Sequence, residues 1–296
     1  MKNTLASLIG NTPMVKISDK LYAKLETTNP SGSIKDRMAL AIIEEAERRG
    51  ELKEGATIVE ATSGNTGIAL SMIAAERGYK MIVVMPSNMS IERKKMIRGF
   101  GAEIVEVGPS DFAGAVAKRD ELVKELGAFN PNQFENPDNT YCHYKTTGQE
   151  IIKQIAELAP GQTISAIVAG TGTGGTLMGI SRALKEKFPN VQTIAVEPTE
   201  SQAMLGGPLG PHGIQGIGDG FIPPIVDMSL VDSVIAVSTE ESLARRARLA
   251  KECGLFVGVS AGANVLSAEK YIEKENPEGI VVTILCDRGE RYLSME

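Results

Sequence analysis

The chain has 296 residues, 42% of them hydrophobic, which is enough to bury the cores of two domains of ordinary size. Its 31 basic and 37 acidic residues give a net charge of −6 without any lysine or arginine block, so we expect no nucleic-acid partner. No apolar run approaches a membrane span and the first residues lack a signal-peptide pattern, so we expect a cytoplasmic protein that binds no membrane.

Short apolar runs alternate with helix-like segments along the chain. Strand-like runs lie at 57–61, 80–86, 103–107, 166–170, 193–198, 234–238, 255–259 and 279–286. Runs of this length separated by helices predict βαβ units and parallel sheets. They are too many for one open sheet, so we predict an α/β fold of two doubly wound domains. The Asn- and Pro-rich stretch 128–141 predicts a helix-poor crossing between these domains.

The sequence has few residues that could serve as metal ligands or as the base of a hydrolase. Its cysteines, Cys142, Cys253 and Cys286, are odd in number and lack metal-ligand spacing, so we expect buried free thiols and neither disulfides nor a metal site. The imidazoles of His143 and His212 could act as bases, but we expect both to be structural.

Two glycine-rich loops, each between a strand-like and a helix-like run, suit anions. The loop ATSGNTG at 61–67 offers small polar groups at a helix entrance, which favour either an anionic oxygen or ordinary helix capping. The loop AGTGTGGTLMG at 169–179 predicts a phosphate cradle at Gly172–Thr176 and lacks the lysine of a Walker loop. A dinucleotide site that uses Glu197 is the alternative.

A third glycine-containing loop and one lysine are further candidates for a binding site. The loop GVSAGAN at 258–264 places Ser260 at a helix entrance, where a plain N-cap is the simpler interpretation. Lys35 lies in the turn-forming stretch SGSIKDR at 31–37. A deprotonated lysine forms Schiff bases with aldehydes. A phosphate cradle, polar helix entrances and such a lysine are the parts needed to hold pyridoxal 5'-phosphate.

With these motifs in order, the sequence resembles the cysteine synthases (O-acetylserine sulfhydrylases), which are fold type II pyridoxal-phosphate enzymes. The resemblance covers essentially the whole chain through IGNTPMV (9–15), NPSGSIKDR (29–37), EATSGNTGIAL (60–70), NPDNTYCHYKTTGQEI (136–151), GTGGTLMG (172–179), GIGDGFIP (216–223), VGVSAGA (257–263) and CDRGERYLS (286–294). The last of these motifs and NMSIERKKM (88–96) are more similar to the B-type branch, and GIGDGFIP is more similar to the A-type branch.

The resemblance implies roles for the matching residues. Lys35 would form the Schiff base with the cofactor and move the substrate Cα proton. The other cofactor contacts would be Asn65, Gly172, Thr173, Gly174, Gly175, Thr176 and Ser260. The substrate contacts would be Thr62, Ser63, Gly64, Thr66, Gln133 and Gly216. The resemblance also implies a smaller mobile domain at 36–138, a larger domain of 1–35 and 139–296, a homodimer, and serine acetyltransferase as a candidate partner.

The activity implied is β-replacement through an α-aminoacrylate, in which O-acetyl-L-serine and sulfide give L-cysteine and acetate. Because Ser260 would be a neutral partner of the pyridine nitrogen, elimination is favoured over transamination.

Asp219 departs from the family pattern, in which a small residue is usual at this position in the sulfhydrylases. It either caps a turn or points to solvent, or it acts as an acid/base group at the site. The second interpretation predicts a lyase that releases sulfide from L-cysteine and forms L-serine, or adds a thiol to give lanthionine or cystathionine. A serine or threonine dehydratase and a non-catalytic α/β binding protein are the remoter alternatives.

Overall fold

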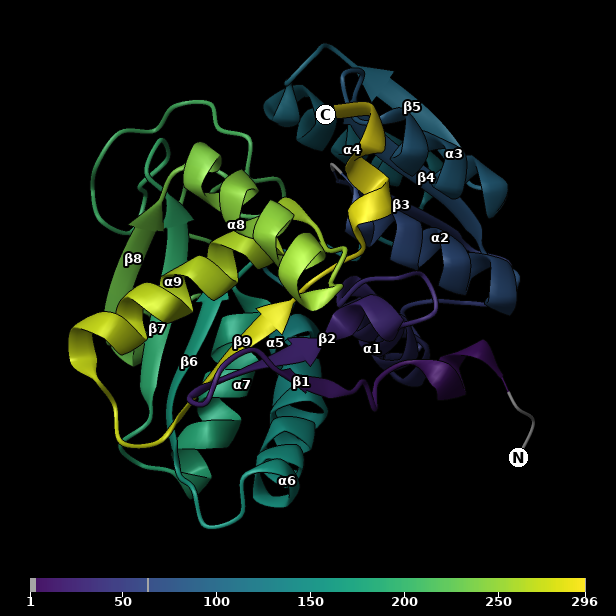
Figure 1. Ribbon diagram of the computed structural model, residues 1–296. Coiled ribbons are helices and arrows are strands. Elements are labelled where there is room, and N and C mark those ends of the chain that lie inside the picture. The colour runs from purple at the N-terminus through teal and green to yellow at the C-terminus, as the bar shows by residue number, and fades with distance from the viewer. Residues whose placement is uncertain (1–3, 63, 296) are drawn as a thin grey trace.

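The computed structural model describes residues 4–62 and 64–295, whose strands form two sheets (Figure 1). The larger sheet has the strand order β1-β2-β9-β6-β7-β8, and the smaller one has the order β3-β4-β5. Their bounds are β1 Met14–Lys16, β2 Leu21–Leu25, β3 Thr57–Ala61, β4 Lys80–Pro86, β5 Glu103–Val107, β6 Ile164–Gly170, β7 Gln192–Pro198, β8 Ser233–Val237 and β9 Ile280–Leu285. Apart from the antiparallel pair β1 and β2, all these pairings are parallel, which confirms the predicted α/β class.

Helices cover both faces of each sheet (Figure 1). The α-helices are α1 Lys35–Arg49, α2 Asn65–Arg77, α3 Ile91–Gly99, α4 Phe112–Leu126, α5 Pro137–Lys145, α6 Thr147–Leu158, α7 Gly175–Lys187, α8 Thr239–Cys253 and α9 Val259–Glu275. The 3-10 helices are η1 Leu5–Leu8, η2 Glu26–Thr28, η3 Met228–Leu230 and η4 Gly289–Met295. Successive strand residues face opposite sides, so Val168 packs in the core under α8 and α9, and Ile167 in the core under α6 and α7.

The smaller sheet is packed in the same way. Helices α1, α2 and α3 contribute to the core on one face, and α4 covers the other face through Ala115. Helix α1 also turns Met38 and Ile42 toward Cys142 of α5, so it contacts both halves of the molecule. The C-terminal η4 crosses from β9 to the smaller sheet (Figure 1), where the backbone N–H of Ser294 donates to Glu92 Oε1 at 3.0 Å. The domain bounds at 36–138 and the mobility of the smaller domain stay predictions.

Three local expectations are wrong. Residues 255–259 form no strand, because the chain makes a single bridge between Val257 and Arg288 and enters α9 at Val259. The crossing at 128–141 becomes helical from Pro137, because the Asn136 side chain caps α5 by accepting the N–H of Asp138 at 3.0 Å. Of the three thiols expected to be buried, Cys142 is buried, Cys286 is half-buried and Cys253 at the end of α8 is exposed.

Within the part of the chain that the structure covers, no helix has both the length and the apolar character needed to cross a bilayer.

Candidate functional site

The candidate site lies at the carboxyl edge of four neighbouring strands, β2, β9, β6 and β7, where ligands of open α/β sheets bind. Lys35 follows β2 and is the first residue of α1. The N–H of Ile34 donates to the carbonyl of Cys286 at 2.9 Å, which fixes the lysine backbone to the end of β9. The Lys35 side chain is half-buried. Its place at the mouth of the sheet, rather than on a solvated helix face, suits a reactive amine.

The glycine loop Gly172–Thr176 follows β6 and leads into α7. A methyl group added at Gly172 would overlap the carbonyl oxygen of Gly216, so this position requires glycine. Gly174 has a φ of +86°, in the left-handed region that favours glycine. The loop therefore holds its backbone closely against neighbouring segments, as a phosphate cradle must.

Polar groups in and directly before this loop are available to bind an anion. The Oγ1 of Thr171 is buried and has no hydrogen-bond partner among the described residues. The first N–H groups of a helix such as α7 lack partners within the helix, and its dipole favours negative charge there. The residues present thus fit the phosphate of the implied cofactor. Asn139 of α5 supports the loop, donating to Thr173 Oγ1 at 3.0 Å and to the Gln133 carbonyl at 2.9 Å.

Asn65, the first residue of α2, belongs to the smaller sheet yet reaches the end of β9. Its Nδ2 donates to Asp287 Oδ2 at 2.7 Å, and Arg291 donates to its Oδ1. The same Asp287 oxygen accepts the hydroxyl of Tyr292 at 2.6 Å. The amide predicted to contact the cofactor ring oxygen is therefore held in place by a fully buried carboxylate.

Ser260 lies in the first turn of α9, buried beside Cys286. Burial raises the pKa of the Cys286 thiol to about 12; the charge of Asp287 adds to this, and Lys35 and the Ser260 hydroxyl oppose it. At neutral pH the end of β9 therefore presents a neutral thiol and a neutral hydroxyl near Lys35.

The polar loop after β3 and the crossing segment meet side by side. The hydroxyl of Thr66 donates to Gln133 Oε1 at 2.7 Å, and both residues are buried, as is Thr62. Gly64 lies against the guanidinium of Arg93, so a methyl group there would approach Arg93 Nε to 2.6 Å. Ser63 lies outside the described residues. The structure thus brings together the remaining groups predicted to hold the substrate carboxylate.

Asp219 lies on the loop after β7 that includes Gly216. Its neighbour Gly218 donates to the carbonyl of Thr171 at 3.0 Å, which joins this loop to the phosphate cradle. Asp219 is exposed to solvent, yet desolvation by surrounding protein raises its pKa against the opposing charges of Lys35 and His212. The Asp219 side chain is therefore accessible to solvent and close enough to Lys35 and His212 to interact with their charges.

The two histidines support the loops. The Nδ1 of His143 lies 2.8 Å from Thr147 Oγ1, and its Nε2 lies 3.3 Å from Thr176 Oγ1 at the phosphate cradle. Burial, with the charges of Arg37 and Lys35, lowers the pKa of His143 well below its usual value, so the ring is neutral. His212 accepts the N–H of Ile214 at Nδ1, which leaves its Nε2 to donate to Gly218.

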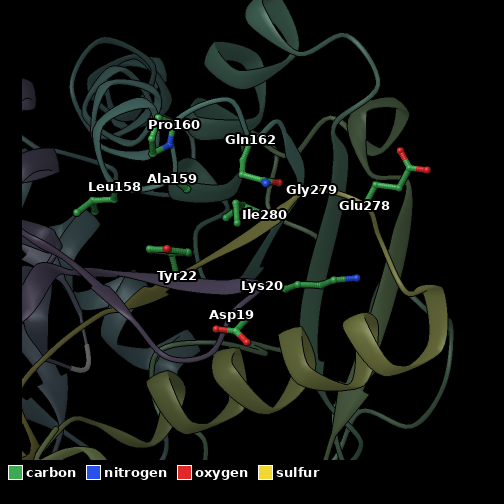
Figure 2. Close-up of a pocket in the computed structure, with 10 residues that line it drawn as sticks. All are labelled: Asp19, Lys20, Tyr22, Leu158, Ala159, Pro160, Gln162, Glu278, Gly279 and Ile280. Atoms are coloured by element: carbon green, nitrogen blue, oxygen red, sulfur yellow. The ribbon is translucent and has the colours of Figure 1, made fainter.

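A separate pocket of about 380 Å³ opens at the opposite, amino-terminal edge of the larger sheet (Figure 2). Tyr22 and Ile280 from β2 and β9 line it, with the side chains of Asp19, Lys20 and Gln162 around them. None of the residues predicted from the motifs lies there. Across the described residues, no group of three or more His, Cys, Asp or Glu side chains could hold a metal ion.

Sequence reasoning missed Asp287, Asn139 and the unpaired hydroxyl of Thr171. Each lies within a motif that it did single out, and two of them, Asp287 and Thr171, follow the carboxyl ends of central strands. That position in a parallel sheet is the signal that could have identified Asp287 and Thr171.

The chain is similar to known proteins over nearly its whole length. A family model described as "Pyridoxal-phosphate dependent enzyme" matches residues 5–287. A cysteine synthase of Staphylococcus aureus (strain Mu50 / ATCC 700699) is 44% identical over 300 residues, covering 99% of this chain and 96% of the relative. The solved structure of an O-ureido-L-serine synthase has a TM-score of 0.92 at 40% identity, covering 99% of this chain and 94% of that one. A hydrogen sulfide-producing enzyme from Fusobacterium nucleatum has a TM-score of 0.93 at 40% identity, covering 98% and 89%.

Proposed function

Because the chain belongs to the family of pyridoxal-phosphate dependent enzymes, we propose that it is a cysteine synthase. In this reaction sulfide replaces the acetate of O-acetyl-L-serine, giving L-cysteine and acetate. The observation that carries the proposal is a set of contacts between the predicted site segments. The residue before Lys35 and the side chain of Asn65 both bind the end of β9, and Thr66 is joined through Gln133 and Asn139 to Thr173 of the cradle. The identity to a cysteine synthase over 99% of the chain supports the same choice of reaction.

The residues that would hold the cofactor come from four segments. Lys35 would bind its aldehyde, the cradle its phosphate, Asn65 its ring oxygen and Ser260 its ring nitrogen. When bound, pyridoxal phosphate supplies an electron sink for charge that develops at the substrate Cα. Asp287 restrains the Asn65 amide, so this contact is oriented in advance.

Lys35 would then move the proton at the substrate Cα. Its backbone is fixed at the first turn of α1, and its half-buried side chain lies close enough to Asp219 and Cys286 to influence their charge. Thr62, Thr66 and Gln133 would hold the substrate carboxylate. A base held in place next to the proton it removes is the arrangement that general-base catalysis needs.

The test is the initial rate of L-cysteine formation by the holoenzyme from O-acetyl-L-serine and sulfide, with acetate measured as the second product. We expect equal amounts of cysteine and acetate. Absence of both products would contradict the proposal.

A second activity is supported by the charge interaction between Asp219 and Lys35 and by the similarity of the chain to a hydrogen sulfide-producing enzyme. In this reaction L-cysteine and water give L-serine and hydrogen sulfide, and the Asp219 carboxylate accepts a proton from the attacking water. With a second thiol in place of water, the product is lanthionine or cystathionine.

We expect Asp219→Asn to lower sulfide release from L-cysteine by at least about tenfold, because the amide cannot accept that proton. Cysteine synthesis from O-acetyl-L-serine, in which the nucleophile is an anion already, is expected to change far less. Sulfide and serine are measured together, with the exposed Asp120→Asn as the control. Equal sulfide release by the wild type and Asp219→Asn would make the carboxylate a bystander.

The proposal includes a cytoplasmic homodimer whose smaller domain, at 36–138, closes over the substrate. Serine acetyltransferase is its candidate partner protein. These points are supported by the family resemblance, and sedimentation of the purified protein with and without the acetyltransferase tests both assemblies.

A further inference from the structure

One buried carboxylate has no part in the reaction as described above. Glu60, next to last in β3, has only 1% of its surface exposed. Its Oε1 accepts the N–H of Ala61 at 3.0 Å and lies 3.6 Å from Arg119 Nη1 of α4. Its Oε2 accepts the N–H of Gln133 at 3.3 Å. The side chain therefore joins the end of β3 to the crossing segment.

Glu60 lies between the two segments predicted to bind the substrate carboxylate, namely the loop after β3 and the crossing segment at Gln133. The chain runs from Glu60 directly into Thr62 and Thr66, and on its other side Glu60 holds the backbone of Gln133. The side chains of Thr66 and Gln133 are themselves joined at 2.7 Å. A shift of Gln133 would therefore move the partner of Thr66 and disturb the geometry of both.

Burying an ionised carboxylate at this position lowers the stability of the fold. Burial raises the pKa of Glu60 to about 7, opposed by the charge of Arg119 and by the N–H groups of Gln133, Ala61 and Asn132. Among the described residues, Arg119 is the basic group within ion-pair distance. Helix α2 and strand β4 pack near β3 through apolar residues such as Ile68 and Val84. Above pH 7 the protein therefore keeps a buried negative charge with incomplete compensation.

We propose that Glu60 is a positioning residue for the substrate carboxylate, acting by fixing the backbone of Gln133 opposite Thr66. The inference rests on the proposed function, since it names the residue that builds the amino-acid subsite of that function. An ionised acceptor binds N–H groups about twice as strongly as a neutral one. This difference explains why position 60 carries a carboxylate, although a neutral glutamine there would destabilise the fold less.

The test measures binding rather than turnover. Calorimetry with the holoenzyme compares L-alanine, which lacks a β-leaving group, with L-alanine methyl ester, which lacks the carboxylate. For Glu60→Gln we expect Kd for L-alanine to rise about tenfold and Kd for the ester to stay unchanged. Glu60→Asp keeps the charge but withdraws the oxygens by one methylene, so it is expected to weaken L-alanine binding as well. Glu103→Gln, an exposed site on β5, is the matched control.

Thermal unfolding separates this role from simple support of the fold. Because folding raises the pKa of Glu60, its contribution to stability is lost as pH rises through about 7. The melting temperature of Glu60→Gln minus that of the wild type should therefore be more positive at pH 8 than at pH 5. A variant that is more stable and binds L-alanine less tightly supports the inference.

Three results would overturn it. They are unchanged L-alanine affinity in Glu60→Gln, an equal loss for acid and ester, or weaker binding that only follows a lower melting temperature. Failure of the wild-type holoenzyme to bind L-alanine would instead contradict the proposed function, and this inference with it.

Discussion

Replacement of Lys35 by alanine is expected to lower kcat for cysteine formation by about 10²–10⁴-fold, the range that a positioned general base contributes. The structure gives this lysine a fixed backbone at the edge where the cradle and the polar loops meet. Since its backbone contacts do not involve the side chain, the variant should fold normally. Steady-state rates with O-acetyl-L-serine and sulfide measure the effect.

Lys53→Ala removes an exposed lysine that follows the far end of α1 from Lys35, so it serves as the matched control. We expect it to keep wild-type rates. A Lys35→Ala variant within about tenfold of the wild type would mean that another group moves the proton.

Substitution of alanine for Gly172 is expected to weaken the affinity for pyridoxal phosphate at least about tenfold. The added methyl group would overlap the backbone oxygen of Gly216, and backbone cannot move aside as a flexible side chain can. Overpacking of this kind costs about 1–3 kcal/mol and displaces the loop that the phosphate needs. Titration of the apoenzyme with pyridoxal phosphate, followed by absorbance, gives the dissociation constant.

Gly99→Ala is the control for this substitution, because nothing lies within 4 Å of a methyl group at that position in α3. Its cofactor affinity should equal that of the wild type. If Gly172→Ala bound the cofactor as tightly as Gly99→Ala, the loop Gly172–Thr176 would not be the phosphate site.

Much of the fold could be predicted from the sequence because parallel strands carry continuous apolar runs. The runs at 57–61, 80–86 and 103–107 coincide with β3, β4 and β5. The apolar run at 255–259 forms no strand, because it makes a single bridge at Val257 and its last residue, Val259, already begins α9. Periodicity cannot distinguish such a run from a short strand.

The candidate site was predictable in its motifs and unpredictable in their pairing. Lys35, Asn65 and Ser260 each stand at the start of a helix, where a local sequence signal exists. The bond from Asn65 to Asp287 joins residues 222 positions apart, and no local pattern encodes such a contact. The environment of Asp219 depends in the same way on Lys35, which only the folded chain brings near it, in addition to His212 of its own loop.

The account rests on Lys35 as the residue that holds the cofactor. The most direct measurement reduces the holoenzyme with borohydride, digests it and locates the modified lysine by mass spectrometry. The account predicts one peptide that carries the reduced cofactor on Lys35. The cofactor on a different lysine, or no modified peptide from a protein that had taken up pyridoxal phosphate, would contradict it.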